Sequence, residues 1–554
     1  MKVTVFGGVC EIGGNKILVE DGGSALLLDF GLPMGRFNSF FDEFVRPRTS
    51  NHLLDVARLG LVPEIDGIYR NDMLANAVRW HAASSMGVPP EAERMYRLDC
   101  ANYDDHIASS GSPRVQAVLL THAHADHYGQ IGYLDQRIPI VCSPVTRILC
   151  EAIQAVSPAS PDSEIYEVRA KSVGTSSDRA TFPEAPSRVN DRDPQVRPYQ
   201  LLDAHAPTQI GAFSVEAIPV DHSLAGCCAF LIRGPSGRTL FYTGDVRFHG
   251  LYSLGPNSIS ERLRGRTTDL RPDILITEGT RITEATTDDE SDVRRRLHEV
   301  VSSTPGLAIV DWAWKDTARF QTVASVAKET GRILCANPKL LALWSTLSAH
   351  DPNEFPPLDT LGDIRAYLER SDTLTYSPAD YQASPHKLGP FLRWDLDDKE
   401  LARRAWESRN SGGLIGCSQL EYLTNAVRAY DIARDPSKYI LQAGYFDIQE
   451  LIDIDPPPGS VYVRAATEPF SDEMRLDEAK LKNWLQRFGV IASDEQFPRT
   501  HVSGHASGTD LLEWIREMRP SNVVPVHTEH PEVFTNELSG MAVIPPTYGE
   551  TLDF

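Results

Sequence analysis

The sequence lacks the features that mark secreted, disulfide-bonded and membrane-spanning proteins. Its eight cysteines form no CxxC pair and no disulfide-like spacing, and most lie in apolar runs, as small core residues of a reduced cytoplasm do. No stretch approaches the roughly 18 uncharged apolar residues of a membrane span, and Met1–Gly8 is typical of a strand and glycine turn rather than a signal peptide. We therefore predict a cytoplasmic protein with no membrane partner, in which any metal site uses histidine and carboxylate ligands.

Basic residues are also scarce. Lysine and arginine number 54 against 76 aspartates and glutamates, which gives a formal net charge of −22. This charge argues against broad electrostatic attraction to nucleic acid, although a local basic groove or bound divalent cations can invert the field at a site. The length of 554 residues, with 41% hydrophobic and 23% charged residues, predicts two or three globular domains.

One short stretch, Thr121–His127, concentrates chemically active side chains after an apolar run of buried-strand type, Val115–Leu120. A strand-to-helix turn of this kind directs several side chains into one small volume, and imidazole with carboxylate suits zinc and similar metals. The alternative is a polar turn whose histidines are satisfied by local hydrogen bonds. The candidate ligands are His122, His124, Asp126 and His127.

Three more candidate ligands stand at the ends of predicted strands. His222 and Asp245 follow two apolar segments in the middle of the chain, and His527 follows another near the C-terminus. A lone histidine or a Gly-Asp turn is usually structural. Because all three come after the HxHxDH stretch with strand spacing between them, together they predict one shared metal site.

Two further carboxylates and a loop accompany these ligands. Asp29 ends a buried strand, where it either hydrogen-bonds ligand histidines or is an ordinary turn aspartate. Glu278 also ends an apolar strand. Arg499–Gly508 is predicted to be a strand that breaks into a small-residue loop before a helix, whose N-terminal amides favour an anion. Within it, His505 is either a proton donor or a loop histidine bonded to the backbone.

The remaining chain divides into three kinds of segment. Residues 36–105 show helical periodicity and predict a helical insertion, which either walls the site or simply packs against it. Residues 157–200 are rich in Ser, Pro, Asp and Arg and predict a surface loop or partly disordered excursion. Helices and strands alternate from about residue 281 to 497, which predicts a separate parallel-sheet domain. The predicted strands are 3–6, 16–20, 25–29, 139–142, 212–220, 227–233, 239–242, 274–276, 307–311, 333–336, 414–417, 440–443 and 522–526, and the predicted helices are 51–61, 71–86, 145–156, 288–302, 317–330 and 510–518.

The order of these motifs resembles a known family. The HxHxDH stretch, the next strand-end histidine, the Thr-Gly-Asp turn and the last strand-end histidine together resemble the metallo-β-lactamase fold. Glu278, the loop Ser503–Ala506 and Pro525–His527 resemble its β-CASP nucleases, and the opening Gly7–Asn15 is similar to ribonuclease J. The nearest resemblance is therefore to the ribonuclease J and mRNA 3′-end processing exonuclease family.

This resemblance implies an α/β fold, a metallo-β-lactamase αββα sandwich that is split in the sequence. Residues 1–280 would form its first part and 498–554 its C-terminal part, with an inserted parallel-sheet β-CASP cap domain at 281–497. It also implies two divalent metal ions, zinc or alternatively manganese. Within the family a further C-terminal domain supports dimerisation; we expect it to be absent here, which leaves a homodimer open.

By the same resemblance each candidate residue has a role. One ion would be held by His122, His124, His222 and Asp245, and the second by Asp126, His127, His527 and the shared Asp245. The catalytic set would be Asp126, His505, Glu278 and Asp29, with Asp29 orienting the site and Glu278 and His505 acting on the leaving group. A substrate phosphate would be bound by Ser503, Gly504, Ala506, Ser507 and, from the cap, Arg319, which is otherwise a surface helix arginine.

The residue types fit phosphodiester hydrolysis without the resemblance. This reaction needs a strong nucleophile at neutral pH, neutralisation of the phosphate charge and a proton for the departing oxygen. Two divalent ions supply the first two requirements, and a histidine outside the ligand set, such as His505 backed by Glu278, supplies the third.

We therefore predict a metal-dependent ribonuclease, exonucleolytic from a 5′ end or endonucleolytic, with RNA as its partner. Histidine rather than valine at position 527 resembles the RNA-acting branch of the family rather than the DNA-repair branch. Two alternatives remain. One is a nuclease acting on DNA, including single-stranded DNA, and the other is a non-nuclease, either a small-ester metallohydrolase or a scaffold.

Overall fold

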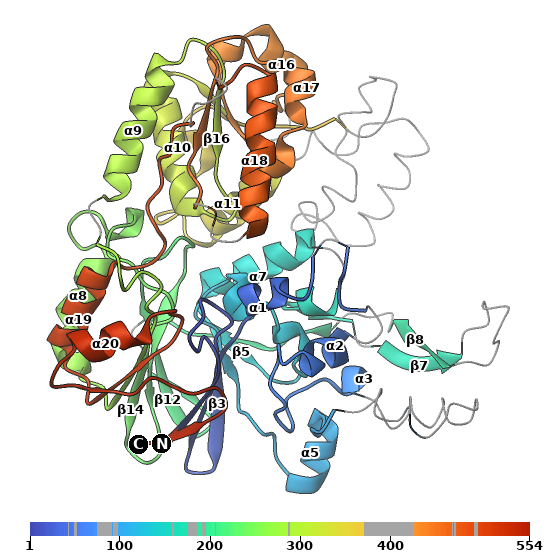
Figure 1. Cartoon of the computed structure of the whole chain (residues 1–554), viewed down its shortest axis with the longest axis vertical. Helices are drawn as coiled ribbons and strands as arrows, with labels where there is room; N and C mark the ends of the chain where they lie inside the picture. Colours follow the sequence, from blue (N-terminus) through green and yellow to red (C-terminus); the bar gives the residue numbers. More distant parts are fainter. Residues whose placement is uncertain are drawn as a thin grey trace.

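The computed structural model shows a β-sandwich with flanking helices and a second α/β unit above it (Figure 1). The structure describes all residues except 43, 49–51, 75–90, 92–97, 158–159, 170, 176–185, 191–194, 205, 286–287, 371–424, 468, 470–471 and 492–496. The predicted strand at 414–417 therefore lies outside the described residues. So does the predicted helix 71–86 beyond its first turn, α3 (Asn71–Leu74).

The first sheet of the sandwich has seven strands in the order β10-β5-β4-β3-β2-β1-β23. Strands β1 to β3 are antiparallel neighbours, whereas β3, β4, β5 and β10 run parallel. Strand β3 is apolar on both faces because one face meets the second sheet and the other meets helices. The bounds are β1 Lys2–Gly7, β2 Lys16–Asp21, β3 Ser24–Phe30, β4 Val118–Leu119, β5 Ile140–Cys142, β10 Tyr199–Leu201 and β23 Thr551–Asp553.

The second sheet also has seven strands, in the order β11-β12-β13-β14-β15-β21-β22. Its first four strands form an antiparallel meander, and β14, β15, β21 and β22 run parallel. The C-terminal part of the chain thus completes a sheet begun three hundred residues earlier. The bounds are β11 Thr208–Ile210, β12 Phe213–Pro219, β13 Cys228–Arg233, β14 Thr239–Tyr242, β15 Ile274–Thr277, β21 Asn522–Pro525 and β22 Ala542–Val543.

The two sheets pack face to face around one apolar core. Leu28 and Val19 of the first sheet and Phe230 and Ile276 of the second lie in the same fully buried cluster. Helix α7 (Pro144–Val156) covers the outer face of the first sheet, and α8 (Ile259–Leu270) and α19 (Gly508–Met518) cover that of the second. This αββα arrangement confirms the predicted fold class.

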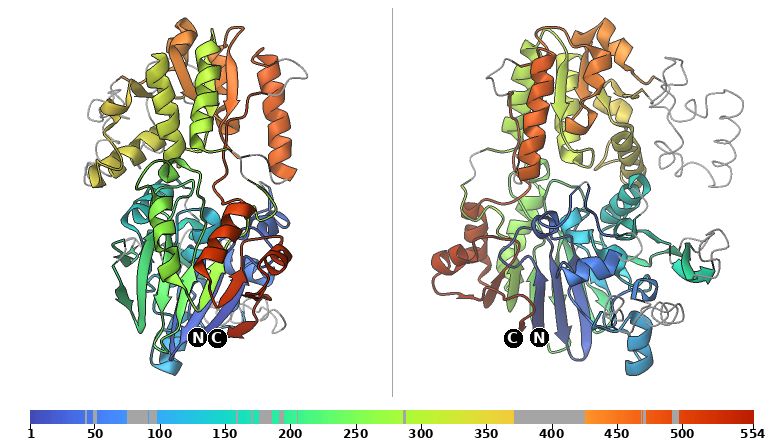
Figure 2. Two further views of the ribbon diagram at one scale, coloured as in Figure 1. Left: turned by 90° about the vertical axis from the view of Figure 1, so that its left-hand side faces the viewer. Right: turned by 45° about the vertical axis from the view of Figure 1, so that its right-hand side comes forward.

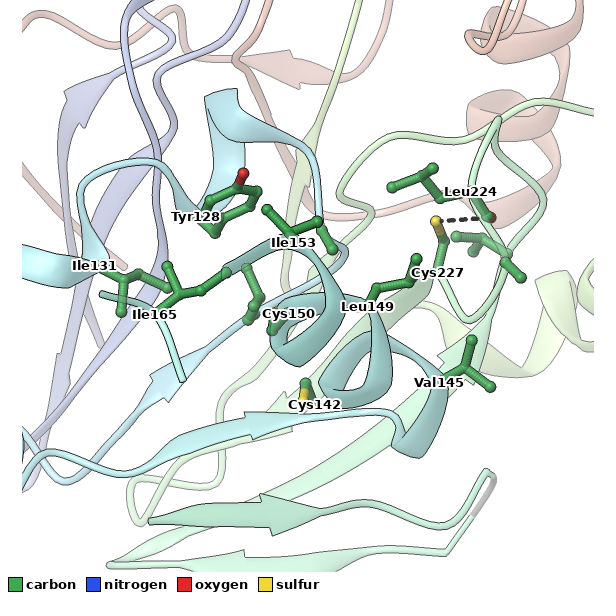
Figure 3. Packing of buried hydrophobic residues seen from close by; sticks show 14 of the residues in the cluster. Tyr128, Ile131, Cys142, Val145, Leu149, Cys150, Ile153, Ile165, Leu224 and Cys227 are labelled. Atoms are coloured by element: carbon green, nitrogen blue, oxygen red, sulfur yellow. Dashed lines mark hydrogen bonds between the residues drawn. The ribbon is translucent and has the colours of Figure 1, made fainter. Parts of the chain in front are cut away.

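Helix α7 packs against two turns that carry predicted metal ligands. The Ser143 hydroxyl caps it by accepting the Thr146 amide at 3.1 Å. Its apolar face packs against Tyr128 on one side and Leu224 on the other (Figure 3). Tyr128 directly follows the Thr121–His127 turn and Leu224 lies two residues after His222. The helix therefore holds both turns against the sheet.

The upper unit is inserted between β15 and β21 and is built on a parallel sheet of order β18-β17-β19-β16-β20. Alternating helices and strands form it, as the sequence predicted. Helix α10 begins with Asp316, whose carboxylate accepts the Arg319 amide at 2.9 Å, and ends at Gly331 with φ 69°. The strands are β16 Ala308–Asp311, β17 Ile333–Ala336, β18 Ile364–Ala366, β19 Tyr439–Gln442 and β20 Val461–Arg464.

The other helices are short or flank these units. Those of the upper unit, called the cap from here on, are α9 Glu290–Ser303, α10 Thr317–Thr330, α11 Pro338–His350, α12 Leu358–Leu361, α16 Ala429–Arg434, α17 Glu450–Ile454 and α18 Asp472–Arg487. Those beside the sandwich are α1 Met34–Asn38, α2 His52–Arg58, α5 Tyr103–Ser110, α6 Ala125–Tyr128 and α20 Pro531–Glu537. Among the described residues, no helix combines the length and apolarity needed to cross a bilayer.

The two chain ends lie side by side at the base of the sandwich (Figures 1 and 2). Strand β23 pairs antiparallel with β1, and the N-terminal ammonium donates to the Phe554 carbonyl at 2.8 Å. The last residues therefore belong to the same sheet as the first ones.

The structure differs from two local predictions. Residues 157–200 contain β6 (Glu167–Val168), β7 (Lys171–Thr175), β8 (Pro186–Asn190), β9 (Gln195–Val196) and the start of β10. Buried Arg197 donates to the carbonyls of Ile131 and Leu134 and so pins this polar segment beside β5. The strand predicted before the small-residue loop is only an isolated bridge between Arg499 and Arg464.

Candidate metal centre

The predicted ligands meet at one edge of the sandwich, facing the cap. Strand β4 leads into the turn of His122, β12 into His222, β14 into Asp245 and β21 into His527. The carboxyl ends of parallel strands lie at the same edge of a sheet, which is where ligands bind in α/β folds. The structure brings together all seven predicted metal ligands in two groups that share Asp245.

The first group consists of His122, His124, His222 and Asp245. His124 Nδ1 lies 3.0 Å from His122 Nε2 and 3.0 Å from His222 Nε2. Asp245 Oδ2 lies 3.7 Å from His122 Nε2 and 3.6 Å from His222 Nε2. Donor atoms around a tetrahedral zinc are separated by roughly 3.3 Å, so these spacings suit one ion among the four side chains.

The second group consists of Asp126, His127, His527 and again Asp245. His127 Nε2 lies 3.2 Å from Asp245 Oδ1 and 3.9 Å from Asp126 Oδ2. His527 Nε2 lies 3.1 Å from Asp126 Oδ2 and 3.7 Å from Asp245 Oδ1. Asp245 therefore turns one carboxylate oxygen toward each group.

Two buried atoms in this centre have no hydrogen-bond partner: His127 Nε2 and Asp245 Oδ1. Leaving a buried ring nitrogen and a buried carboxylate oxygen unsatisfied is costly in free energy. The two atoms lie 3.2 Å apart, a separation at which one cation can be bound by both. The donor types, their spacing and these two atoms all fit a divalent metal, which the imidazole and carboxylate ligands favour.

Asp29 supports the centre from behind, as expected of a carboxylate that orients ligands. Its Oδ2 lies 2.8 Å from His127 Nδ1 and accepts the hydroxyl of Tyr242 at 2.7 Å. Its Oδ1 accepts the Thr121 amide at 2.9 Å. With Nδ1 of His127 held by this carboxylate, Nε2 is the atom that faces the second group. Asp29 itself adopts φ 52°, a left-handed conformation that aspartate tolerates.

The other histidines are oriented by neutral groups. His222 Nδ1 donates to the Gly504 carbonyl, and His122 Nδ1 lies 3.0 Å from the Thr121 hydroxyl. His527, with φ 52°, places Nδ1 at 2.8 Å from the Thr280 hydroxyl. Each contact fixes which ring nitrogen remains for a metal.

Glycines allow the backbone to approach Asp126 closely. A Cβ on Gly31 would lie 1.6 Å from the Asp126 carbonyl oxygen, and one on Gly13 would lie 2.7 Å from its Cβ. The Gly14 amide donates to the Asp126 carbonyl at 3.0 Å. The glycine-rich opening of the chain thus packs directly under the ligand turn.

Burial favours the neutral, metal-binding form of the three histidines in the first group. It lowers the pKa of His122, His124 and His222 well below the usual value, and neighbouring imidazoles add to this. For Asp126 and Asp245 burial raises the pKa, but His127 and His527 outweigh it, so the net pKa of each carboxyl is lowered. Neutral imidazoles and ionised carboxylates are the forms that bind metals.

His505 and Glu278 form a pair beside the centre. His505 Nδ1 lies 2.9 Å from Glu278 Oε2 and 3.8 Å from Asp245 Oδ2. Glu278 is buried, and its other oxygen accepts the Val246 amide at 2.9 Å. Burial lowers the pKa of His505, but Glu278 and Asp245 raise it more, to about 9. The ring is therefore protonated at neutral pH, and the alternative of a loop histidine bonded only to the backbone does not apply.

The predicted phosphate loop is only partly available. The Ser507 hydroxyl caps α19 by accepting the Asp510 amide at 3.1 Å, and the Ala506 amide donates to the Val246 carbonyl at 2.6 Å. Both residues are buried. Ser503 and Gly504 are partly exposed beside His505 and remain candidates for a phosphate contact.

Arg319 is not at this loop, which corrects the prediction that it contacts phosphate. Its guanidinium is buried and paired with Glu290 at 2.9 and 3.1 Å. It also donates to the carbonyls of Ala465 at 2.7 Å and Thr500 at 2.8 Å. These contacts tie two cap helices to the segment that returns to the sandwich, so the buried guanidinium is already bound by protein groups.

Several supporting residues were not found by sequence reasoning. Thr121, Tyr242 and Thr280 act through contacts with Asp29 or His527 that join distant segments. Thr121 is the only one with a sequence signal, since it adjoins the histidine cluster. Lys315 also had no signal in the sequence, because its position depends on how the cap contacts the sandwich.

Comparison with protein families agrees with this geometry. Residues 106–303 match the beta-lactamase superfamily domain, and residues 499–538 match the Zn-dependent metallo-hydrolase RNA specificity domain. All seven candidate metal ligands lie within these two segments. The residues that form the centre therefore resemble those of a beta-lactamase superfamily domain and of a Zn-dependent metallo-hydrolase domain.

Among individual proteins, the chain is similar to ribonucleases J. Ribonuclease J of Sinorhizobium meliloti is 25% identical over 422 residues, which cover 75% of this chain and 58% of that protein. Ribonuclease J of Mycolicibacterium smegmatis is 25% identical over 419 residues, covering 74% and 58%. The chain resembles ribonuclease J, as the motif order predicted, and the match spans less than two thirds of the length of these relatives.

A solved structure extends the likeness to the whole fold. A protein of unknown function from Enterococcus faecalis V583 superposes with a TM-score of 0.62 at 20% sequence identity. The alignment covers 100% of this chain and 99% of the other. At this identity the likeness concerns the fold alone.

Proposed function

We propose that this protein is a metal-dependent ribonuclease that hydrolyses RNA phosphodiester bonds, as a 5′-to-3′ exonuclease with endonucleolytic cleavage as a second mode. One observation carries the proposal: Asp245 directs Oδ2 toward one ligand group and Oδ1 toward the other. A carboxylate shared in this way suits two divalent ions, zinc or manganese. The chemistry that two such ions supply when bound is activation of water at neutral pH and neutralisation of phosphate charge.

The chain's own residues supply the remaining steps. Glu278 holds Nδ1 of His505, so the Nε2 side of the ring is the one that can present a proton to the departing oxygen. Ser503 and Gly504 are partly exposed in the same loop as that histidine and can position a phosphate. The Gly504 carbonyl also orients His222, so the same loop connects substrate contact with ligand geometry.

RNA is the proposed substrate because of the resemblance and the comparisons. The matched C-terminal segment is described as an RNA specificity domain, and the relatives are ribonucleases J. A 5′ end as the starting point follows from the family resemblance of the motifs. A cytoplasmic setting is part of the proposal, since most described cysteines are buried and the described ones are free thiols.

The test is a cleavage time course on one RNA oligomer and its DNA equivalent. Each oligomer carries a 5′-monophosphate or a 5′-hydroxyl, and the protein is loaded with zinc or manganese. Asp126→Ala and His505→Ala are compared with His530→Ala, a matched control, because His530 is exposed and three residues beyond His527.

We expect mononucleotides from the monophosphorylated RNA, abolished by the first two substitutions and unchanged in the control. Internal fragments regardless of the 5′ group would make the enzyme an endonuclease. Preference for the DNA oligomer would overturn the choice of RNA. No cleavage of either oligomer by the metal-loaded protein would overturn the nuclease proposal.

A further inference from the structure

Lys315 occupies the junction between the cap and the metal centre. It lies between β16 and α10, at the carboxyl end of an interior strand of the parallel cap sheet. Just beyond it, the Thr317 hydroxyl lies 3.3 Å from the hydroxyl of Tyr252 in the sandwich. The first turn of α10 therefore faces the sandwich, and Lys315 is partly buried at this contact.

The surroundings of Lys315 include the metal ligands. Its ammonium is in electrostatic range of Asp126 in the second ligand group and of His124 in the first. Burial lowers the pKa of the Lys315 ammonium, and the nearby Asp126 raises it. The effect of burial is larger, so the pKa is lowered overall. Lys315 is thus a cap side chain that interacts electrostatically with both ligand groups.

In the described part of the chain, the Lys315 ammonium makes no hydrogen bond and has no carboxylate within 4 Å. Arg319, four residues on, shows the opposite pattern, since its guanidinium is fully paired with Glu290 and two carbonyls. A partly buried ammonium loses part of its hydration, and the attraction of Asp126 does not offset this loss. An anion that enters from outside the protein would compensate it.

We propose that Lys315 binds a phosphate of the nucleic-acid strand next to the bond that is cut, and that the cap supplies this contact. The inference rests on the proposed nuclease function and assigns a substrate contact that Arg319 was expected to make. Lysine recognises phosphate as a point charge and reads no base. The contact should therefore strengthen binding of any sequence equally.

The test compares Lys315→Ala, Lys315→Arg and a matched control, Lys328→Ala, in the metal-loaded protein. Lys328 lies on the same helix α10 but is exposed and donates to the Thr360 carbonyl at 3.0 Å. Binding is measured with single-stranded phosphorothioate RNA over a salt series, and turnover is measured on RNA and on bis(p-nitrophenyl) phosphate. The latter has a phosphodiester to cut but no neighbouring phosphate.

We expect Lys315→Ala to weaken RNA binding and raise KM for RNA about 10-fold, as loss of a charged hydrogen bond does. The slope of log K against log salt should fall by about 0.7, the value for one phosphate contact on a single strand. Lys315→Arg should recover most of both, and hydrolysis of bis(p-nitrophenyl) phosphate should stay within about twofold of wild type, as a distant phosphate contact allows. Unchanged metal content and unfolding temperature would exclude a merely structural effect.

An unchanged salt slope in Lys315→Ala would overturn the proposal. So would an equal loss on RNA and on bis(p-nitrophenyl) phosphate, because Lys315 would then act on the metal centre itself. Failure of wild type to cleave RNA would instead overturn the nuclease function. The RNA-binding salt slope still decides the role of Lys315 in that case, so the two failures are distinguishable.

Discussion

The two halves of the metal centre are supported by different chemistry. In the first group, His222 is held by a main-chain carbonyl and His122 by a threonine hydroxyl. In the second group, His127 is held by the carboxylate of Asp29. Burial lowers the pKa of His127 as it does for the others, but Asp245, Asp29 and Asp126 outweigh it and raise the net pKa. The first half therefore has neutral support, whereas the second combines a carboxylate on His127 with the Thr280 hydroxyl on His527.

The halves also differ in how the chain builds them. The first group comes from residues 122–245, within the matched superfamily segment. The second requires His527, which lies 401 residues from its partner Asp126. His527 reaches the centre because strand β21, which precedes it, pairs with β15. The comparison teaches that the first half is complete within residues 122–245, whereas the second depends on the return of the chain after the cap.

The largest effect should come from removing the residue that the halves share. Asp245→Asn leaves one oxygen and no charge between the groups, so we expect both ions to be lost. Activity should fall by more than the roughly 100-fold typical of outer contacts of a metal site. Metal content by elemental analysis, measured beside turnover, checks this. Retention of one ion would show that the ligand group that binds this ion does not need Asp245.

Asp29→Asn should separate the halves. Because its carboxylate contacts His127 directly, we expect binding of the second ion to weaken about 10- to 100-fold while the first ion stays bound. Chelator competition measures both affinities. Asp21→Asn is the control, since Asp21 is a buried aspartate on neighbouring β2 that bonds Ser236 and not a ligand. Equal weakening of both ions would contradict the distinction.

The pH profile tests the acid beside the metal centre, His505. The pKa of His505 is raised to about 9, so its protonated form persists through neutral pH and is lost as pH rises through about 9. Activity should decline over that range. The pairing of His505 with Glu278 contributes its whole stabilisation of the fold at a pH below the ordinary histidine pKa. This contribution is lost as the pH rises through about 9. Removing the charge with Glu278→Gln should move the decline of kcat/KM to lower pH by roughly one to two units.

The control for this profile is His530→Ala, an exposed histidine outside the ligand groups, in which the decline should stay at the wild-type pH. A decline that stays at the same pH in Glu278→Gln would mean that another group titrates.

The smallest effects should come from the neutral hydroxyl contacts. Thr280→Val removes the contact to His527, at 2.8 Å, and Ser223→Ala removes that to His124, at 3.3 Å. Loss of a neutral hydrogen bond weakens binding about fivefold. We expect Thr280→Val to affect the second ion and Ser223→Ala the first, and less strongly because the contact is longer. Calorimetric metal titration of both variants decides, and a crossed pattern would refute the assignment.

Local patterns predicted most of the elements and of the ligand set. The strands of both sheets and helix 317–330 follow apolar periodicity, and the ligands stand where strands end. Such positions can be predicted because hydrophobic period and turn chemistry act within a few residues. The strands of the polar segment 157–200 were not predicted, and the end of this segment is held beside β5 by a buried arginine, Arg197, that donates to a distant turn.

The loop contacts were less predictable. Ser507 looked like an anion ligand because small residues precede a helix, yet its hydroxyl serves as the helix cap. Arg319 looked like a phosphate contact, yet it is paired with Glu290, 29 residues away, and with Thr500, 181 residues away. A sequence shows that a side chain can bind an anion, but not that a protein group already occupies it.

By itself, the sequence determined the kinds of ligand and the strand ends that carry them, because residue type and local period are properties of neighbours in the chain. Only the tertiary structure decided which ring nitrogen of each histidine faces the metal site and that Asp245 serves both halves. It alone decided that Arg319 is buried and paired with Glu290, and that Lys315 is partly buried within electrostatic range of Asp126. These facts depend on groups hundreds of residues apart that meet only when β21 closes the second sheet and the cap rests on the sandwich.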